Sequence, residues 1–213
     1  IVTLTGVAGT GKTLCALAAA LSQLEIDGFQ KSASADGGAV VTPTKRRRKS
    51  ANANSSESTM AQSLKRYKKL IITRPVIPMG PEIGFEPGPK GAKMACWTGS
   101  ISDNLEYLFG STDVMNTYIE SGIIEIEAPT YIRGRSIANS IIIVDEAQNL
   151  TSHEMKTIVT RVGHFSKILL LGDVSQTDHK RLTEITNGLS VVVEKFKGYS
   201  LFGHVTLTKG ERS

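Results

Sequence analysis

The sequence predicts an α/β domain in which helices flank a parallel sheet, and two features lead to that prediction. Short apolar runs alternate along the chain with segments of helical spacing, as they do in βαβ units. Glycine-rich or acidic residues follow directly after three of those runs, and the carboxyl ends of parallel strands are where open sheets bind ligands. A length of 213 residues, of which 40% are apolar, suits one such domain with its own core.

Six apolar segments are predicted to form strands, at 1–5, 70–74, 123–127, 141–145, 167–172 and 204–208. Four segments with helical patterns lie between them, at 12–25, 101–109, 152–162 and 187–196. The Pro- and Gly-rich stretch at 75–91 is predicted to be a long loop after the second strand. No apolar run reaches the roughly 18 residues that a membrane span needs, so we expect no membrane partner.

Positive charge is concentrated in one segment of the chain. The formal net charge is +5, yet residues 30–69 alone carry +8, which leaves −3 for the rest. Residues 31–63 are rich in Ser, Ala, Asn and Gly and almost lack large apolar residues, so we expect a disordered basic insertion there. Its KRRRK run at 45–49 has three interpretations: a solvated loop, a nucleic-acid tether, or a nuclear localisation signal.

The cysteine count bears on the compartment. Cys15 and Cys96 are too few for a disulfide scaffold and favour a reducing environment. We therefore expect a cytoplasmic protein, or a nuclear one if KRRRK is a localisation signal. The chain starts at Ile1 with neither a Met nor a signal-peptide pattern, which we interpret as a fragment or excised domain.

The string GVAGTGKT fits the complete GxxxxGK[ST] pattern of a phosphate-binding loop. It follows an apolar strand and opens a helix, so backbone N–H groups and the positive end of the helix dipole would face phosphate oxygens. Lys12 is predicted to reach the β- and γ-phosphates of a nucleotide, and the Thr13 hydroxyl to ligate Mg²⁺. The predicted phosphate-binding residues are Gly6, Val7, Ala8, Gly9, Thr10, Gly11, Lys12 and Thr13.

Another strand ends in two acids, Asp145 and Glu146, within IIIVDEAQN. Asp145 at the strand tip is predicted to hold Mg²⁺, either directly or through the residues and water around it. Glu146 is predicted to polarise the attacking water. Because adjacent side chains on a strand point to opposite faces, only the turn at the strand end can aim both carboxylates at one site.

A third strand leads into LLLGDVSQTD, where Gln176 can bond both a γ-phosphate and a water and so respond to the nucleotide state. The NKxD-like base reader of a switch GTPase is absent from the sequence, and a small-molecule kinase needs an acceptor pocket and a mobile Arg-rich lid. An acid pair on one strand and GDxxQ on another indicate nucleotide hydrolysis coupled to motion. The predicted fold class is therefore a RecA-like P-loop NTPase.

Several longer strings resemble the PhoH family of ATPases: GVAGTGKTLCALAA, ITRPVIPMGPEIGFEPG, DNLEYL, TYIRGRSIANSIIIVDEAQNLTSHEMKTIVTRVG and HVTLTKGERS. The branch that this chain resembles is the PIN–PhoH fusion proteins, and only about residues 30–63 fall outside the resemblance. The resemblance implies a core related to superfamily 1 helicases, ATP hydrolysis with Mg²⁺, and RNA unwinding. It also implies ring-shaped homo-oligomers such as hexamers, and a PIN nuclease domain in the same or an associated chain.

The resemblance extends to individual residues. It agrees with the roles predicted above for the phosphate loop, the acid strand and Gln176. Arg212, in KGERS, looks like the arginine that completes an ATP site, within the chain or from a neighbouring subunit. Arg74, in ITRP, resembles the helicase segment that touches nucleic acid or couples it to ATP.

Two further arginines have two possible roles, and the function has more than one interpretation. Arg133 and Arg135 precede the acid strand, where they either contact a substrate backbone or an interface, or lie in a solvated turn.

The first hypothesis for the function is a Mg²⁺-dependent ATPase that acts on single-stranded RNA as a translocase or helicase. The second is an ATP-switched oligomeric module that presents a nuclease to RNA with little motor activity. A phosphotransferase is a third, weaker interpretation.

Overall fold

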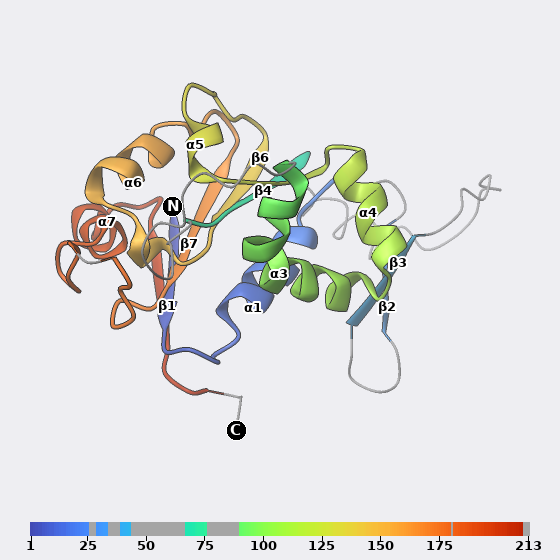
Figure 1. Cartoon of the computed structure of the whole chain (residues 1–213), viewed down its shortest axis with the longest axis horizontal. Coiled ribbons are helices and arrows are strands. Elements are labelled where there is room, and N and C mark those ends of the chain that lie inside the picture. The colour runs from blue at the N-terminus through green and yellow to red at the C-terminus, as the bar shows by residue number, and fades with distance from the viewer. Residues whose placement is uncertain (26–28, 34–38, 44–66, 76–89, 180, 211–213) are drawn as a thin grey trace.

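The computed structural model describes residues 1–25, 29–33, 39–43, 67–75, 90–179 and 181–210 (Figure 1). Its centre is a six-stranded sheet in which all neighbouring strands run parallel. Across the sheet the strands are β5 Ile124–Glu127, β4 Lys69–Thr73, β6 Ser140–Val144, β7 Lys167–Gly172, β1 Val2–Gly6 and β8 Gly203–Leu207. These are the six predicted strands, none shifted at either end by more than one residue, which confirms the α/β class.

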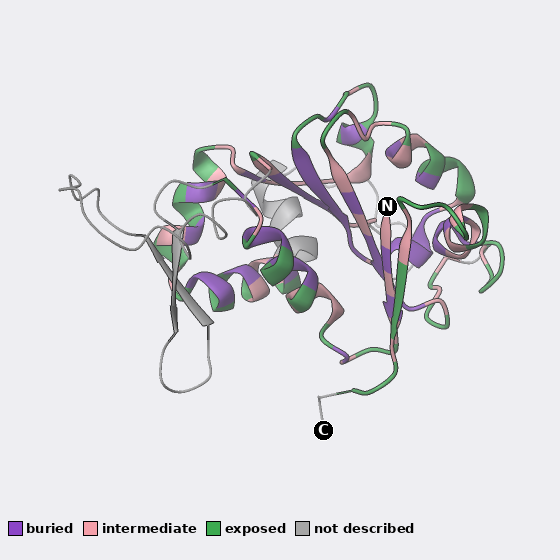
Figure 2. Ribbon diagram, turned by 180° about the vertical axis from the view of Figure 1, so that it is seen from behind, coloured by how far each residue is buried: buried purple, intermediate pink, exposed green. Residues whose placement is uncertain are grey.

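The alternation of side chains along the central strands divides the core between the two faces of the sheet. Ile141 and Ile143 of β6 belong to one core, whereas Ile142 and Val144 belong to the other. Figure 2 shows the buried strands as a layer between two sets of helices. The first core includes α1 Lys12–Leu21, α3 Lys90–Phe109 and α4 Thr112–Glu120, and the second includes α5 Pro129–Ile132, α6 Ser152–Val159 and α7 Gly188–Phe196.

Two helices end earlier than their sequence patterns predict. α1 ends at Leu21 because Leu24 leaves the helix to form a parallel bridge with Tyr67, just before β4. α6 ends at Val159 because the backbone then turns, so that Val162 forms a bridge with the segment before β6. In both cases a tertiary backbone pairing replaces the last helical turn.

Two other helices differ from the prediction: one begins earlier than expected, and one was not predicted. α3 begins at Lys90 rather than near 101, and most of the predicted 75–91 loop lies outside the described residues. α4 has no counterpart in the sequence prediction, because only Met115 and Tyr118 are buried and its apolar stripe is narrow. Within the described part of the chain, no helix is long and apolar enough to cross a bilayer.

The predicted disordered insertion contains an antiparallel pair of strands. β2 Phe29–Ala33 pairs with β3 Ala39–Pro43, and Phe29 lies opposite Pro43. The expectation of disorder is therefore corrected for these strands. The string VVT within β3 supplies residues of high β-propensity that the low-complexity composition of the whole segment conceals. Residues 44–66, which include the KRRRK run, lie outside the described residues.

Candidate active site

The loop between β1 and α1 has the backbone geometry of a phosphate cradle. Gly9 and Gly11 have φ values of 80° and 74°, in the left-handed region that glycine adopts without steric cost. Gly6 packs closely against the neighbouring strand, since a Cβ there would lie 2.4 Å from the Leu207 carbonyl oxygen. Gly11 is the N-cap of α1, so the first N–H groups of this helix are available at the mouth of the loop.

The Lys12 side chain folds back over the same loop. Its Nζ donates to the Gly6 carbonyl oxygen at 2.7 Å and to the Val7 carbonyl oxygen at 2.9 Å. The Thr10 hydroxyl also donates to Val7, at 2.9 Å, which tightens the turn around the exposed Ala8. Carbonyl oxygens do not neutralise an ammonium, so Lys12 is placed to form charge-assisted hydrogen bonds with phosphate oxygens.

A hydrogen bond joins the phosphate loop to the acid strand. The Thr13 hydroxyl donates to Oδ1 of Asp145 at 3.1 Å, across 132 positions of sequence. The Asp145 N–H donates to the Thr73 carbonyl oxygen at 2.8 Å, which fixes the turn after β6 against the end of β4. A hydroxyl and a carboxylate oxygen at the mouth of a phosphate loop are ligands that Mg²⁺ takes together with phosphate oxygens and water. These residues therefore fit the predicted Mg²⁺ site.

Burial makes the charged form of Asp145 unfavourable in the absence of a cation. The residue is 4% exposed. Burial, together with the neighbouring charge of Glu146, raises the pKa of Asp145 above its usual value. The charge of Arg74 and the Thr13 hydrogen bond oppose this rise without cancelling it. A bound metal ion would favour the carboxylate form, and its attraction is stronger in a site from which water is largely excluded.

We expect Asp145→Asn to raise the melting temperature of the ligand-free protein at neutral pH. A raised pKa means that the folded state binds the proton more tightly than the unfolded state, so stability falls as pH rises through the folded-state pKa. Asn is neutral throughout, and its advantage should shrink as the pH is lowered. Thermal melts from acidic to neutral pH measure the effect, with the exposed Asp103→Asn as the control. A variant less stable than wild type at neutral pH would contradict this expectation.

Glu146 leaves the strand in a left-handed backbone conformation, with φ 51° and ψ 41°. This conformation is uncommon for residues other than glycine, and it ends the alternation of the strand at the acid pair. Arg74, directly after β4, lies beside both carboxylates: its Nη2 is 3.8 Å from Glu146 Oε1, and its charge lowers the pKa of Asp145. Both acids of the pair are therefore at the same end of β6.

Arg74 also contacts α3, because its Nη1 donates to the Ser100 hydroxyl at 2.8 Å. The guanidinium thus connects α3 to Glu146, the predicted water-activating residue. The sequence offered two roles for Arg74, contact with nucleic acid and coupling of nucleic acid to ATP. Both stay predictions, and the bridging position favours coupling.

Gln148 is not among the residues predicted from the sequence, and it is fully buried, with 0% of its surface exposed. Its Nε2 donates to Glu146 Oε2 at 2.7 Å and to the Gln176 carbonyl oxygen at 3.0 Å, and its Oε1 accepts from the Asp173 N–H at 3.2 Å. One amide thus ties the loop after β6 to the loop after β7. The available signal was a pair of polar strings, DEAQN and GDVSQTD, which the sheet order makes neighbours.

A second amide supports the same loop contact. Asn149, which is 5% exposed, accepts a hydrogen bond from the Asp178 N–H at 2.9 Å. Gln176 lies between Asp173 and Asp178, whose N–H groups donate to Gln148 and Asn149. The residue is exposed at this edge of the sheet. Its role as a γ-phosphate sensor stays a prediction. Arg212, predicted to complete the site, lies outside the described residues.

We expect Gly172→Ala to destabilise the fold and to displace Gln148. A Cβ on Gly172, the last residue of β7, would lie 2.3 Å from Gln148 Oε1 and 2.8 Å from Leu189 Cδ2. Both neighbours are fully buried, so the structure must shift, at a cost of about 1–3 kcal/mol. Urea unfolding measures the change. Gly203→Ala in β8 is the matched control, since a Cβ there meets nothing within 4 Å. Equal unfolding free energies for the two variants would contradict this account.

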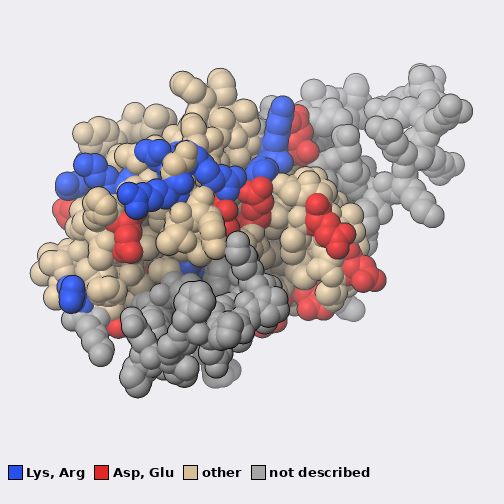
Figure 3. All heavy atoms as spheres, turned by 45° about the horizontal axis from the view of Figure 1, so that its top comes forward, with Lys and Arg blue, Asp and Glu red and all other residues tan. Residues whose placement is uncertain are grey.

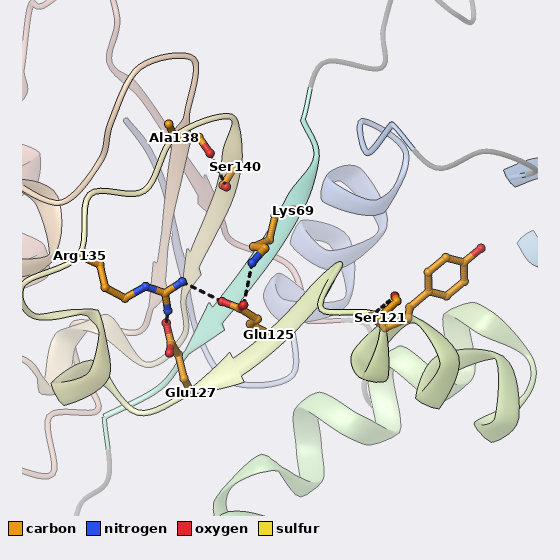
Figure 4. Close-up of polar contacts among 8 residues, drawn as sticks. Lys69, Ser121, Glu125, Glu127, Arg135, Ala138 and Ser140 are labelled. Carbon is orange, nitrogen blue, oxygen red and sulfur yellow. Dashed lines mark hydrogen bonds and ion pairs between the residues drawn. The ribbon is translucent and has the colours of Figure 1, made fainter.

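Arg133 and Arg135 have different environments, although the sequence treats them alike. Arg135 donates to Glu127 at 2.5 Å and to Glu125 at 3.0 Å, and Lys69 donates to Glu125 at 2.7 Å (Figure 4). Burial alone would raise the pKa of Glu125, but hydrogen bonds and charges from Lys69 and Arg135 hold it below its ordinary value. Arg133 is exposed and pairs with no carboxylate among the residues described.

The fold and the site together define a class of protein, the P-loop NTPases. A RecA-like parallel sheet carries a glycine-rich phosphate loop after β1. Asp145, of the acid pair after β6, accepts a hydrogen bond from Thr13 in the helix that follows this loop. A family model described as PhoH-like protein matches residues 55–212. This chain belongs to the PhoH family, which confirms the resemblance seen in the sequence.

Individual relatives are longer than this chain. It is 46% identical over 218 residues to Protein PhoH2 of Bacillus subtilis (strain 168), a match that covers 100% of this chain and 40% of that protein. It is 38% identical over 150 residues to Protein PhoH2 of Thermobispora bispora, covering 70% of this chain and 34% of the relative. The chain therefore spans two fifths or less of the length of these relatives. Among solved structures, unliganded Pif1 from Bacteroides sp is similar at a TM-score of 0.31 and 14% identity, over 100% of this chain and 38% of that one.

Proposed function

We propose that this chain is a Mg²⁺-dependent ATPase whose hydrolysis is coupled to single-stranded RNA. The observation that carries the catalytic part is the 3.1 Å hydrogen bond from Thr13 to Asp145. Because of it, phosphates bound at the glycine-rich loop would lie beside the carboxylates that hold metal and activate water. Membership of the PhoH family, with its P-loop NTPase fold, supports the same conclusion.

In the proposed reaction a water oxygen attacks the γ-phosphorus while the bond to the β–γ bridging oxygen breaks, which releases ADP and phosphate. Glu146 accepts the proton of the attacking water. Lys12 donates to the phosphate oxygens on which negative charge accumulates. Thr13 and Asp145 would hold Mg²⁺, which would supply positive charge to the phosphate oxygens. Gln176 contacts the γ-phosphate and so distinguishes ATP from ADP.

The coupling to RNA is supported by the contacts of Arg74. This residue joins Ser100 of α3 to Glu146, at 2.8 Å and 3.8 Å respectively. A shift of α3 when RNA binds would therefore reach the residue that activates water. Coupling of this kind requires an element with two arrangements that both ligands bias.

The steady-state ATPase rate, measured with and without a single-stranded oligoribonucleotide, tests both parts of the proposal. We expect Mg²⁺-dependent turnover that RNA stimulates, and a loss of at least about 10²-fold in Lys12→Ala, because a donor to the transition-state charge is removed. Turnover that is absent in the wild type, or unchanged in Lys12→Ala, would contradict the ATPase assignment.

The same assay separates the remaining interpretations. Slow turnover that is indifferent to RNA, together with ATP-dependent assembly on a sizing column, would favour an ATP-switched oligomer that presents a PIN-type nuclease to RNA. Transfer of the γ-phosphate to an acceptor other than water would favour a phosphotransferase. A homo-oligomeric ring and a PIN nuclease partner are further proposals, which the sizing column and co-purification test.

A further inference from the structure

A groove beside α6 gathers cationic side chains on the sheet face opposite to α1. Its volume is about 410 Å³, and no residue of the phosphate loop lines it. Arg133 and Gly134, in the segment after α5, form one wall. His153, Lys156 and Arg161, from α6 and the turn after it, form the other, together with two threonines. We call this feature the α6 groove.

The lining residues of the second wall recur at helical spacing. His153, Lys156 and Thr157 occupy positions i, i+3 and i+4 of α6, which share one face of a helix, and Thr160 and Arg161 follow in the turn after it. Met155 and Ile158, on the opposite side of α6, are buried in the second core. The part of this wall that lies on α6 therefore faces outward, and Thr160 and Arg161 continue it into the turn after the helix.

The cations of the groove are not neutralised by neighbouring acids. No carboxylate in the described part of the chain forms an ion pair with Arg133, Lys156 or Arg161. Glu154, on the same helix, is instead held at its N-terminus in a capping box with Thr151. Figure 3 shows a band of Lys and Arg side chains across the surface that α5 and α6 form. Unpaired charge of one sign in a groove attracts and concentrates ligands of the opposite sign.

The polar groups left for a ligand are the cationic ones. The hydroxyls of Thr157 and Thr160 donate to backbone carbonyl oxygens of the helix, at 2.9 Å and 3.0 Å. Arg161 has only a weak contact from Nη2 to the Thr160 hydroxyl, at 3.3 Å, while its Nε is buried without an acceptor among the described residues. Arg133, Lys156 and Arg161 therefore supply the charge that the groove presents, and such cations bind phosphate oxygens.

We propose that the α6 groove binds the phosphodiester backbone of single-stranded RNA, an inference that rests on the proposed coupling to RNA. Lys156 on α6 and Arg161 in the turn after it carry the charge of one wall and Arg133 that of the other, so phosphates of one flexible strand can meet a charge from either wall. Arg135, two residues from Arg133, takes no part, because Glu125 and Glu127 neutralise it.

The position of α6 connects this groove to the active site. The helix begins at Ser152, directly after the loop that carries Asp145, Glu146 and Gln148. A strand bound along α6 therefore stabilises one position of the helix that continues from the catalytic loop. RNA in the groove and nucleotide at the phosphate loop would in this way bias the same element.

Fluorescence anisotropy of a labelled single-stranded oligouridine, titrated with the full chain at several salt concentrations, tests the proposal. The double variant Arg133→Ala/Lys156→Ala should bind more weakly. Its slope of log affinity against log salt should be shallower by about 1.4, since each lost phosphate contact accounts for about 0.7 on a single strand. Lys195→Ala/Lys197→Ala removes the same charge from exposed positions at the end of α7 and should leave the slope unchanged.

The outcomes separate this inference from the proposed function. If wild type binds the RNA and Arg133→Ala/Lys156→Ala binds with the same affinity and slope, the groove assignment fails while RNA coupling stands. If wild type binds no RNA, both fail. An equal loss in the α7 control, or a preference for duplex RNA or polyglutamate, would also overturn the assignment. Melting temperatures show whether each variant is folded. If the double variant does not fold, Lys156→Gln at its exposed position replaces it, and we expect the slope of log affinity against log salt to change by about 0.7.

Discussion

Glu146→Gln should still bind ATP, while its turnover falls by about 10²–10⁴-fold, the contribution typical of a general base. The amide keeps the size of the side chain and retains an acceptor for the Gln148 Nε2, which lies 2.7 Å from Glu146 Oε2. It cannot accept the proton of the attacking water. The contact with Arg74 is 3.8 Å long and about one third exposed, so its loss should change the free energy of unfolding little.

Three measurements distinguish this result from a general loss of structure. Equilibrium binding of a labelled ATP analogue reports nucleotide affinity, single-turnover assays report the chemical step, and thermal melts report the fold. Glu194→Gln, at an exposed position of α7, is the control and should match wild type in all three. Wild-type turnover in Glu146→Gln would show that another group activates the water.

Gln148→Ala should reduce both the stability and the turnover of the protein. The substitution leaves the buried Asp173 N–H without its acceptor, which costs about 1–3 kcal/mol for such a group. It also releases Glu146 and the loop of Gln176 from their shared donor. Misplacement of a catalytic group by about 1 Å can cost 10²-fold in rate, so we expect a loss of that order in kcat. Because Gln148 touches no phosphate-loop residue in these contacts, KM should change less than kcat.

Gln148→Glu tests the same role at nearly constant volume. A glutamate keeps an acceptor for Asp173 N–H but places a second carboxylate where an amide now donates to Glu146 at 2.7 Å. We expect kcat to fall in Gln148→Glu as well, and stability to fall at least as much as in Gln148→Ala, because the new carboxylate is buried beside that of Glu146. A stability loss with wild-type kcat in Gln148→Ala would mean that Gln148 is structural only. Wild-type kcat in Gln148→Glu would contradict its positioning role.

The strands and the phosphate loop could be predicted from the sequence because their signals are local. An apolar run with turn residues at its ends identifies β6 or β7 without reference to any other part of the chain. The loop motif likewise contains its own glycines, its lysine and the start of its helix. Helix α4 shows the limit of such signals, since its narrow apolar stripe acquires meaning only against the core it covers.

Contacts between motifs required the tertiary structure, because they depend on which strands become neighbours. Gln148 is an ordinary polar residue in DEAQN, and it becomes a link between the loops after β6 and β7 only because these two strands pair. Arg74 reaches Glu146 because β4 pairs with β6 on the other side. The order of strands in a sheet is set by packing of the whole chain rather than by any short string.

The chain by itself therefore determined which residue types are available for nucleotide chemistry and on which elements they lie. Only the tertiary structure decided their partners. Arg133 and Arg135 illustrate this most directly: in the sequence they are equivalent cations, yet β5 supplies two carboxylates to Arg135 and none to Arg133. The physical reason is that the strength of a charge–charge contact depends on distance and exposure, which folding creates between residues far apart in the sequence.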